Sequence, residues 1–380
     1  MMAHEAVVER VQRRLAGQSR AATAAEIAAV VREEAGAISD VDVLTILRRL
    51  RDDSVGVGAL EPVLALPGVT DVLVNGPDQV WFDRGRGVER AEVRFPDASA
   101  VRRLATRLAV SAGARLDDAQ PFADGRLSRE DGTSIRFHAV LNPPSESGTC
   151  LSLRVLRQAT LSMEELVRLE AMPPAVADFL REMTRQRCSY LIVGGTGTGK
   201  TTLLSALLAQ VPDTERLLCI QDTAELAPSH PHVVNLVARR ANVEGRGAIT
   251  LSELVRQGLR MRPDRIVVGE IRGAEIVDLF STLNTGHEGG AGTLHAHSLA
   301  EVSARIEALA ALGGLGRQAA HSQWAAAVRV ILVMRRLRNG RRVLAQIGVG
   351  ERTDSGLVHV REAWRMGQDA SCLAAVGAWE

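Results

Sequence analysis

The feature that most constrains this chain is a glycine-rich segment between an apolar stretch and an expected helix. Residues 191–202 read Leu-Ile-Val-Gly-Gly-Thr-Gly-Thr-Gly-Lys-Thr-Thr and match the pattern G-x-x-x-x-G-K-[ST]. A strand is expected at 189–193 and a helix at 200–210. Glycines let backbone N–H groups curl around phosphate oxygens, and the N-terminus of a helix adds a positive dipole end. The segment therefore predicts a loop that binds the phosphates of a nucleotide.

The pattern assigns phosphate contacts to individual residues. The expected nucleotide-binding residues are Gly194, Gly195, Thr196, Gly197, Thr198, Gly199, Lys200, Thr201 and Thr202. Lys200 is expected to reach the β- and γ-phosphates of ATP, and the Thr201 hydroxyl to ligate Mg²⁺. Lys200 is also the only lysine among 46 basic residues. A single lysine among so many arginines indicates a site where a guanidinium does not fit.

The rest of the chain predicts an α/β protein. Residues 1–55 are expected to be helical, 56–157 to form a small α/β domain, 158–174 to be a linker, and 175–380 to form the P-loop domain. Strands and helices alternate from residue 175, which favours a mostly parallel sheet, and Asn339-Gly340 predicts a C-terminal β-hairpin. In the smaller domain, strands are expected at 72–74, 80–82, 91–95, 134–140 and 151–155, with a helix at 98–112. Capping boxes are expected at 162–165 and 250–253.

Composition excludes several classes of protein. The net charge of +1 argues against a protein held on DNA or membranes by bulk charge. The four cysteines form no C-x-x-C pair, so neither a zinc site nor a disulfide framework is expected. The N-terminus does not resemble a signal peptide, and no uncharged apolar run reaches the ~20 residues that span a bilayer. A cytoplasmic protein is expected, with peripheral membrane association left open.

Three segments downstream of the glycine-rich loop indicate what the nucleotide is used for. Gln221, Asp222 and Glu225 end one expected strand, Glu270 ends another, and His295 lies in the glycine-rich stretch 285–297. Ligands of open α/β sheets bind at the carboxyl ends of the strands, where a carboxylate can polarise water or hold a metal-bound water. Taken singly, Glu225 also fits a helix cap, Glu270 an ion-pair partner and His295 an ordinary buried histidine.

Together, these segments resemble the secretion ATPase superfamily of type II and type IV systems, and within it the Tad/Flp pilus assembly motors (CpaF/TadA-like). The resemblance covers residues 56–350: 194–202 resembles the Walker A motif, 221–225 the Asp box, 267–272 the Walker B motif and 286–295 the His box. It implies a RecA-like P-loop domain that hydrolyses ATP with Mg²⁺. It also implies a homohexamer on the inner face of the cytoplasmic membrane, acting on inner-membrane platform proteins of a pilus or secretion system.

The resemblance implies roles for the acidic residues and for two arginines. Glu270 is the expected catalytic carboxylate, supported by Gln221, Glu225 and His295, while Asp222 and Glu270 join Thr201 as the expected metal ligands. Arg136 and Arg154 of the smaller domain stand at positions where the family supplies arginines to the nucleotide. A solvated strand face would explain both arginines equally.

Some features leave alternatives open. The family usually has Glu where this chain has Gln221, and an amide cannot take a proton from water at neutral pH. Gln221 is therefore consistent with a nucleotide-gated scaffold of low turnover, or with an ATPase in which Glu270 is the main carboxylate. A conjugation motor of the same superfamily fits the motifs as well. The arginine-rich hairpin at 335–342 lacks aromatic residues, so nucleic-acid binding and a helicase role are disfavoured.

Overall fold

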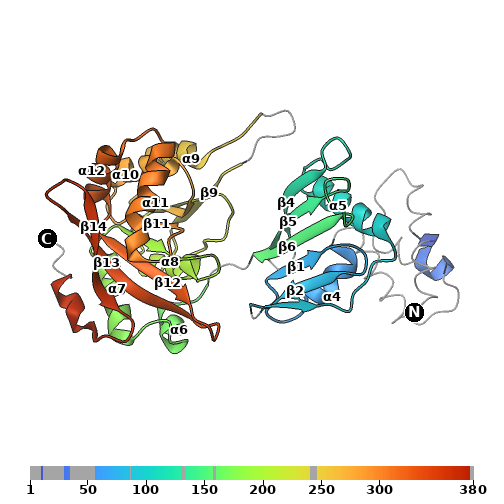
Figure 1. Cartoon of the computed structure of the whole chain (residues 1–380), viewed down its shortest axis with the longest axis horizontal. Helices are drawn as coiled ribbons and strands as arrows, with labels where there is room; N and C mark the ends of the chain where they lie inside the picture. The colour runs from blue at the N-terminus through green and yellow to red at the C-terminus, as the bar shows by residue number, and fades with distance from the viewer. Residues whose placement is uncertain are drawn as a thin grey trace. The chain divides into compact units, whose positions relative to one another are not determined.

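The computed structural model describes residues 10–11, 30–34, 56–85, 87–129, 133–156, 160–239 and 246–376. They belong to two compact units, Met1–Leu156 and Arg157–Glu380 (Figure 1). The helical region expected at 1–55 lies outside the described residues, except for residues 10–11 and 30–34, which are helical. Across the described ranges, no helix combines the length and the apolar composition needed to cross a bilayer.

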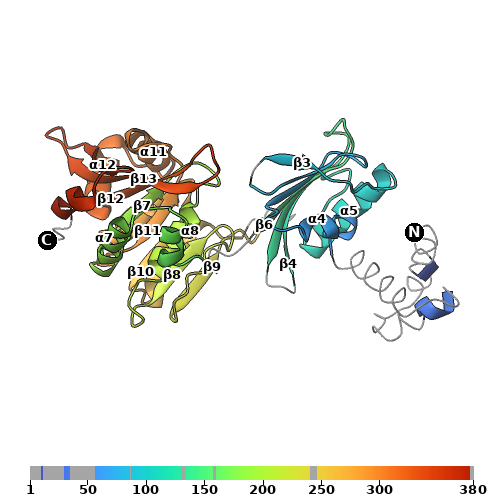
Figure 2. The same cartoon turned by 90° about the horizontal axis from the view of Figure 1, so that it is seen from below.

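The first unit is built on a six-stranded antiparallel sheet of order β3-β2-β1-β6-β5-β4. Its strands are β1 (Asp71–Val74), β2 (Val80–Asp83), β3 (Val88–Arg90), β4 (Phe122–Ser128), β5 (Ser134–Val140) and β6 (Cys150–Leu156). Its helices are η1 (Gly58–Leu60), α4 (Glu61–Leu64) and α5 (Ala98–Ser111). Helix α5 starts at the N-cap Asp97 and packs with α4 on one face of the sheet (Figure 2). The strands alternate buried and exposed side chains because only this face is covered.

The prediction of a strand at 91–95 is wrong. The ladder ends with β3 at Arg90, after which the Ala91 N–H donates to the Val80 carbonyl and the Phe95 N–H to the Pro77 carbonyl. The Phe95 side chain is buried, so an apolar residue serves the core here without extending a strand. Strand β4 is missing from the sequence expectations because its side chains are mostly exposed or half-buried and show no apolar alternation.

The second unit contains an eight-stranded sheet of order β14-β13-β12-β7-β11-β10-β8-β9. Its strands are β7 (Tyr190–Val193), β8 (Leu217–Gln221), β9 (Val233–Val237), β10 (Arg265–Ile271), β11 (Ala291–Leu294), β12 (Val330–Arg336), β13 (Arg342–Arg352) and β14 (Val358–Arg365). Strands β12, β7, β11, β10, β8 and β9 run parallel, and β13 and β14 are antiparallel additions. The expected parallel sheet and C-terminal hairpin are confirmed, and β14 extends the hairpin by one strand.

Helices cover both faces of this sheet. They are α6 (Met163–Arg168), α7 (Pro174–Arg185), α8 (Lys200–Leu208), α9 (Leu251–Gly258), η2 (Leu259–Met261), α10 (Glu275–Leu283), α11 (Leu299–Leu312), α12 (Arg317–Ala327) and η3 (Ala370–Ala375). Helices α6, α7 and α8 pack on one face, and α9 to α12 on the other (Figure 1). Along β7, Tyr190 and Ile192 face the first helical layer, while Leu191 and Val193 face the second. A strand buried on both faces reads as a continuous apolar run, which explains its sequence.

The segment expected as a linker at 158–174 contains helix α6. Ser162 caps this helix, and Glu165 completes the reciprocal pair of bonds, so the expected capping box is confirmed. Met163 and Leu166 are buried in the core of the second unit. The described part of the segment therefore belongs to the folded second unit, because its apolar side chains have a core to enter. The second expected capping box, Thr250 with Glu253, is also confirmed at the start of α9.

Candidate functional site

The expected motif segments follow four neighbouring parallel strands of the second unit. The order β7-β11-β10-β8 places the ends of these strands along one edge of the sheet. The glycine-rich loop follows β7, His295 follows β11, Glu270 lies near the end of β10, and Gln221 ends β8. Register fixes the edge, since Leu294 is paired with Val193 on one side and with Ile271 on the other. Residues up to about 100 positions apart in sequence thereby meet at one place.

The glycine-rich loop has a shape that side chains would prevent. A Cβ added at Gly194 would lie 2.4 Å from the Met334 carbonyl oxygen of β12. Gly199 is the N-cap of α8 and has φ +94°, a left-handed conformation that favours glycine. The loop therefore lies tightly against β12 and directs its chain into the N-terminus of α8, as a phosphate-binding loop requires.

Lys200 is held inside this loop. It is 8% exposed, and its Nζ donates to the carbonyl oxygens of Gly194 and Gly195, at 3.0 Å each. Burial lowers the pKa of Lys200, and the negative charge of Glu270 counteracts part of that effect. The amine is thus pre-positioned beside the loop, in a space formed by backbone oxygens.

Glu270 occupies an irregular point of strand β10. The pairing of β10 with β11 shifts register between Val268 and Ile271, which is a bulge at Gly269 and Glu270. Bulges redirect side chains, and they are frequent next to functional sites. The Glu270 Oε1 forms a hydrogen bond with the His295 Nε2, and its Oε2 accepts from the Arg272 Nη2. Both carboxylate oxygens are therefore bonded to neighbouring side chains.

Arg272 links two of the expected site residues. Its Nη2 bonds Glu270, and its Nη1 lies 3.3 Å from the Asp222 Oδ2. Burial acts to raise the pKa of Glu270, but Arg272 and His295 outweigh it and hold that pKa below its usual range. Glu270 is accordingly an ionised carboxylate between two nitrogen donors. Residue spacing does not predict that Arg272 contacts Asp222, because the contact depends on how β8 and β10 align.

The Gln221 amide is used within the protein. Gln221 is 2% exposed; its Oε1 accepts from the N–H groups of Glu225 and Leu226, and its Nε2 donates to the Leu226 carbonyl and the Asn235 Oδ1. These bonds fix the turn that follows β8. Asp222 lies in that turn, and Glu225 is close enough to act electrostatically on Lys200 and Arg272.

Two further residues lie next to the glycine-rich loop, although the motifs predict neither position. The Arg342 Nε, on β13, donates to the Gly197 carbonyl at 2.9 Å, so one arginine of the hairpin contacts the phosphate-binding loop. The His297 ring lies beside Gly195, since a Cβ added there would be 3.4 Å from its Cε1. Sequence spacing offered no signal for either contact, because 145 and 102 residues separate the partners.

Arg136 and Arg154 lie in the first unit. They are directly opposite each other on β5 and β6, and Arg126 of β4 is opposite Arg136 on the other side. The Arg154 Nε donates to the Asp71 Oδ1 at 2.9 Å. Three arginines therefore cross neighbouring strands on the face that α5 does not cover, and like charges in such positions repel unless an anion lies near them.

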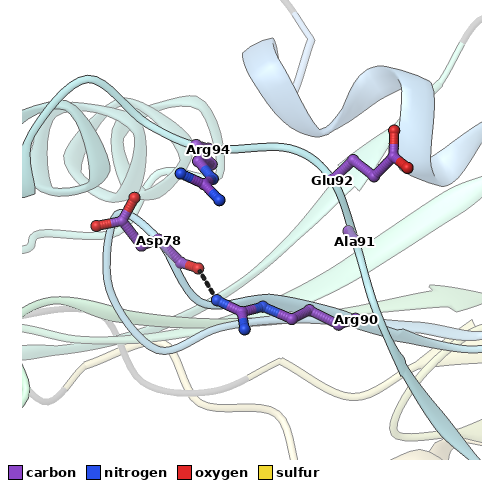
Figure 3. A pocket seen from close by; sticks show the side chains of 5 residues that line it. All are labelled: Asp78, Arg90, Ala91, Glu92 and Arg94. Carbon is purple, nitrogen blue, oxygen red and sulfur yellow. Dashed lines mark hydrogen bonds between the residues drawn. The ribbon is translucent and has the colours of Figure 1, made fainter.

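A pocket of about 340 Å³ also lies in the first unit. Asp78, Arg90, Ala91, Glu92 and Arg94 line it (Figure 3). The Arg90 Nη2 donates to the Asp78 carbonyl at 3.1 Å, and none of the expected site residues borders the pocket. Within the described ranges, no three His, Cys, Asp or Glu side chains form a metal site by themselves.

Comparison with known families assigns the chain. Residues 53–372 match the family described as type II/IV secretion system protein. The chain belongs to this family. Among its relatives, a putative conjugal transfer protein of Mycobacterium tuberculosis is 56% identical over 342 residues, which cover 88% of this chain and 97% of the relative. The conjugal transfer protein TrbB of Rhizobium radiobacter is 30% identical over 280 residues, covering 72% of this chain and 82% of TrbB.

Two solved structures support the fold of this family member. The Legionella pneumophila ATPase DotB matches with a TM-score of 0.54 and 18% identity, covering 72% of this chain and 75% of DotB. The pilus retraction motor PilT with bound ADP matches with a TM-score of 0.54 and 19% identity, covering 74% of this chain and 78% of PilT. At these identities the likeness concerns the fold alone, and it agrees with the expected RecA-like domain.

Proposed function

We propose that this type II/IV secretion system protein is an ATPase motor that hydrolyses ATP to ADP and phosphate with Mg²⁺. One observation carries the proposal: the glycine-rich loop, Glu270, His295 and the turn after β8 lie on one edge of a parallel sheet. A buried lysine amine and an ionised carboxylate at the same edge are the two groups that phosphoryl transfer to water needs.

The residues of the edge fit a Mg²⁺-nucleotide. Thr201 lies in the first turn of α8, directly after Lys200, and the Asp222 and Glu270 carboxylates stand at the same edge. A hydroxyl with one or two carboxylates, completed by phosphate oxygens and water, suits Mg²⁺. Bound there, Mg²⁺ would neutralise charge on the phosphates.

The chain's own groups then have separate tasks. The loop residues 194–202 and Lys200 bind the phosphates, while Glu270 orients water and accepts its proton. His295 holds the orientation of Glu270 through the bond to Oε1. Glu225 balances the charge of Lys200, and Gln221 fixes the turn that carries Asp222. Gln221 therefore gives no support to a scaffold of low turnover, because its amide is bonded to the adjacent turn and to Asn235.

Arg136 and Arg154 extend the proposal to assembly. We propose that the protein forms a homohexamer, in which these arginines approach the nucleotide from the first unit or from a neighbouring subunit. The row of arginines on one open sheet face supports this role, since it is an arrangement that an anion would stabilise. Mass measurement with and without a non-hydrolysable ATP analogue tests it: a monomer under both conditions, at high protein concentration, would contradict the ring.

Two transport systems fit the motor. The names of the relatives favour conjugal or type IV transfer, while the motifs resemble Tad/Flp pilus motors. In either system, the protein would act at the inner face of the cytoplasmic membrane on inner-membrane platform proteins. Identification of the membrane protein that co-purifies with it separates the two: a pilus platform protein supports the Tad/Flp system, and a coupling or channel protein supports conjugation.

Replacement of the P-loop lysine tests the ATPase proposal. Lys200→Ala is expected to lower phosphate release by about 100-fold or more, because it removes a phosphate-binding charge. Lys200→Arg should fail similarly, since a planar guanidinium does not fit between the Gly194 and Gly195 carbonyls. Arg361→Gln, in an exposed pair with Glu351, is the control and should be unaffected. Near-normal phosphate release by either lysine variant would refute the assignment.

A further inference from the structure

Arg272 occupies the two carboxylates on which the proposed reaction depends. It bonds the Glu270 Oε2 and lies 3.3 Å from the Asp222 Oδ2. The other oxygen of Glu270 is bonded to His295. Each Glu270 oxygen keeps a second lone pair that can accept a hydrogen bond from water, but the negative charges of Glu270 and Asp222 are screened from a cation while they are paired with the guanidinium. A metal cation that binds Asp222 and Glu270 must therefore compete with a side chain already paired with them.

Exposure and anchoring indicate that Arg272 is the partner that leaves. Its side chain is 53% exposed, whereas that of His295 is 32% exposed. The Arg272 backbone N–H is fixed by a 2.6 Å bond to the Glu275 Oε1, so the side chain can swing without moving the strand end. A long side chain on a fixed backbone changes partners at little cost, whereas the short imidazole of His295 follows directly from strand β11.

The charges at this edge explain why Arg272 would pair with the carboxylates and later release them. Asp222, Glu225 and Glu270 are carboxylates, and the charges of Arg272 and Lys200 interact with them. Nucleotide phosphates bring further negative charge to the same edge. Without a cation on Glu270 and Asp222, these carboxylates would repel the phosphates. Arg272 is placed to screen that repulsion until a divalent cation takes over the carboxylates.

We propose that Arg272 is a positioning residue that acts as an exchangeable counter-ion: it neutralises Glu270 and Asp222, and it releases them when the site takes Mg²⁺ with the nucleotide. This inference rests on the proposed nucleotide site. It predicts that Arg272 sets how strongly nucleotide binding depends on Mg²⁺. The relevant quantity is the ratio of the ADP dissociation constant in EDTA to that in Mg²⁺, and it requires no turnover.

Titration calorimetry of ADP with the whole chain, in EDTA and in Mg²⁺, tests the proposal. Arg272→Gln is expected to raise the ratio about tenfold or more, because Mg²⁺-free affinity falls by that factor, about 1.4 kcal/mol, while affinity with Mg²⁺ changes little. Arg361→Gln, which removes an exposed arginine from the pair with Glu351, should leave the ratio unchanged. The same ratio in wild type and Arg272→Gln would overturn the proposal.

Two further variants keep the proposal falsifiable if Arg272→Gln is poorly folded. Arg272→Lys keeps the charge and is expected to stay within about threefold of the wild-type ratio; a ratio as high as that expected for Arg272→Gln would exclude the counter-ion role. In the double variant Glu270→Gln with Arg272→Gln, Mg²⁺-free affinity should recover, because one repelling carboxylate is gone. No recovery would also contradict the proposal. Wild-type protein that binds no ADP in either solution would refute the nucleotide site itself.

Discussion

Strand β10 carries an arginine–glutamate interaction at each end, and the two have opposite characters. At its start, Arg265 is fully buried and bonds Glu215 at 2.7 Å. Its Nη1 also donates to the Thr184 carbonyl at 2.7 Å. At the other end, Arg272 is half exposed and shares Glu270 with His295. An arginine and a glutamate therefore form a buried pair at one end of β10 and a partly solvent-exposed pair at the other.

The difference shows how burial decides the use of an ion pair. A buried charge without its partner is costly, so Arg265 and Glu215 must stay together for the sheet to remain folded. A half-exposed guanidinium can exchange its partner for water, and that freedom makes it useful next to a ligand. The N-terminal end of β10 is thus a structural anchor, and its C-terminal end is a site where partners change.

The largest effect is expected at the open end. Glu270→Gln keeps the size of the side chain but removes the charge and the ability to accept a proton. Turnover is expected to fall by about 10² to 10⁴-fold, while the free energy of unfolding falls by no more than about 1.5 kcal/mol, because the bonds to Arg272 and His295 are weakened. Phosphate release and urea unfolding measure the two quantities. A large loss of stability with normal turnover would assign Glu270 a structural role and remove the contrast.

The opposite result is expected at the buried end. Arg265→Leu leaves Glu215 buried without its main partner and deprives the Thr184 carbonyl of a donor. The free energy of unfolding should fall by about 3–5 kcal/mol, as measured by urea unfolding. The exposed pair is the control, and Arg361→Gln should cost under about 1 kcal/mol. Equal costs at both sites would show that burial does not separate the two kinds of pair.

A third substitution tests the turn after β8, which lies at the open end. Gln221→Glu restores the residue that the resembled family usually has, but a carboxylate cannot donate to the Leu226 carbonyl and the Asn235 Oδ1. The free energy of unfolding is expected to fall by about 1–3 kcal/mol, without a gain in turnover. Gln221→Met, which also lacks the donor, should be destabilised as well. A rise in turnover of about tenfold would instead show that residue 221 serves the water.

The smallest expected effect is the response to acid. Burial acts to raise the pKa of Glu215, but Arg265 and Arg187 outweigh it and hold the pKa below its usual range. A carboxylate with a lowered pKa stabilises the fold above its unfolded pKa of about 4.3, and that contribution is lost as the pH falls through the folded value. Urea midpoints should therefore decline below pH ~4.5. Glu215→Gln should flatten this decline and Glu351→Gln should not; an unchanged decline in Glu215→Gln would place the acid response elsewhere.

Local patterns in the sequence predict local structure well here. The glycine-rich loop and the caps at Ser162 and Thr250 each depend on residues within a few positions of one another. The parallel sheet is predictable because strands such as β7 and β8 are largely apolar and buried on both faces. Strand β11 is not, because its Ala-Gly-Thr-Leu sequence resembles a loop, although all four residues are buried. The segment 91–95 is the opposite case: its sequence predicts a strand, but its apolar residues pack into the core without pairing as a strand.

The hydrogen-bond and ion-pair partners of the site residues could not be predicted from the sequence. The motifs indicate that Glu270 and Asp222 belong to one site, but not that Arg272 joins them. The Gln221 side chain can be read as facing water until its four bonds to the adjacent turn and strand are seen. Each of these contacts depends on strand register and side-chain direction, and neither leaves a trace in residue spacing.

The position of β7 between β12 and β11 has a consequence for the gene. Because β12 pairs with the strand that leads into the glycine-rich loop, the Met334 carbonyl and Arg342 form part of that loop's surroundings. A frameshift or stop codon after residue 328 would spare every recognisable motif. It would nevertheless turn β7 into an edge strand with unpaired backbone groups, exposed to pairing with other chains. A truncated gene of this kind would encode intact motifs in a protein unable to hold them in place.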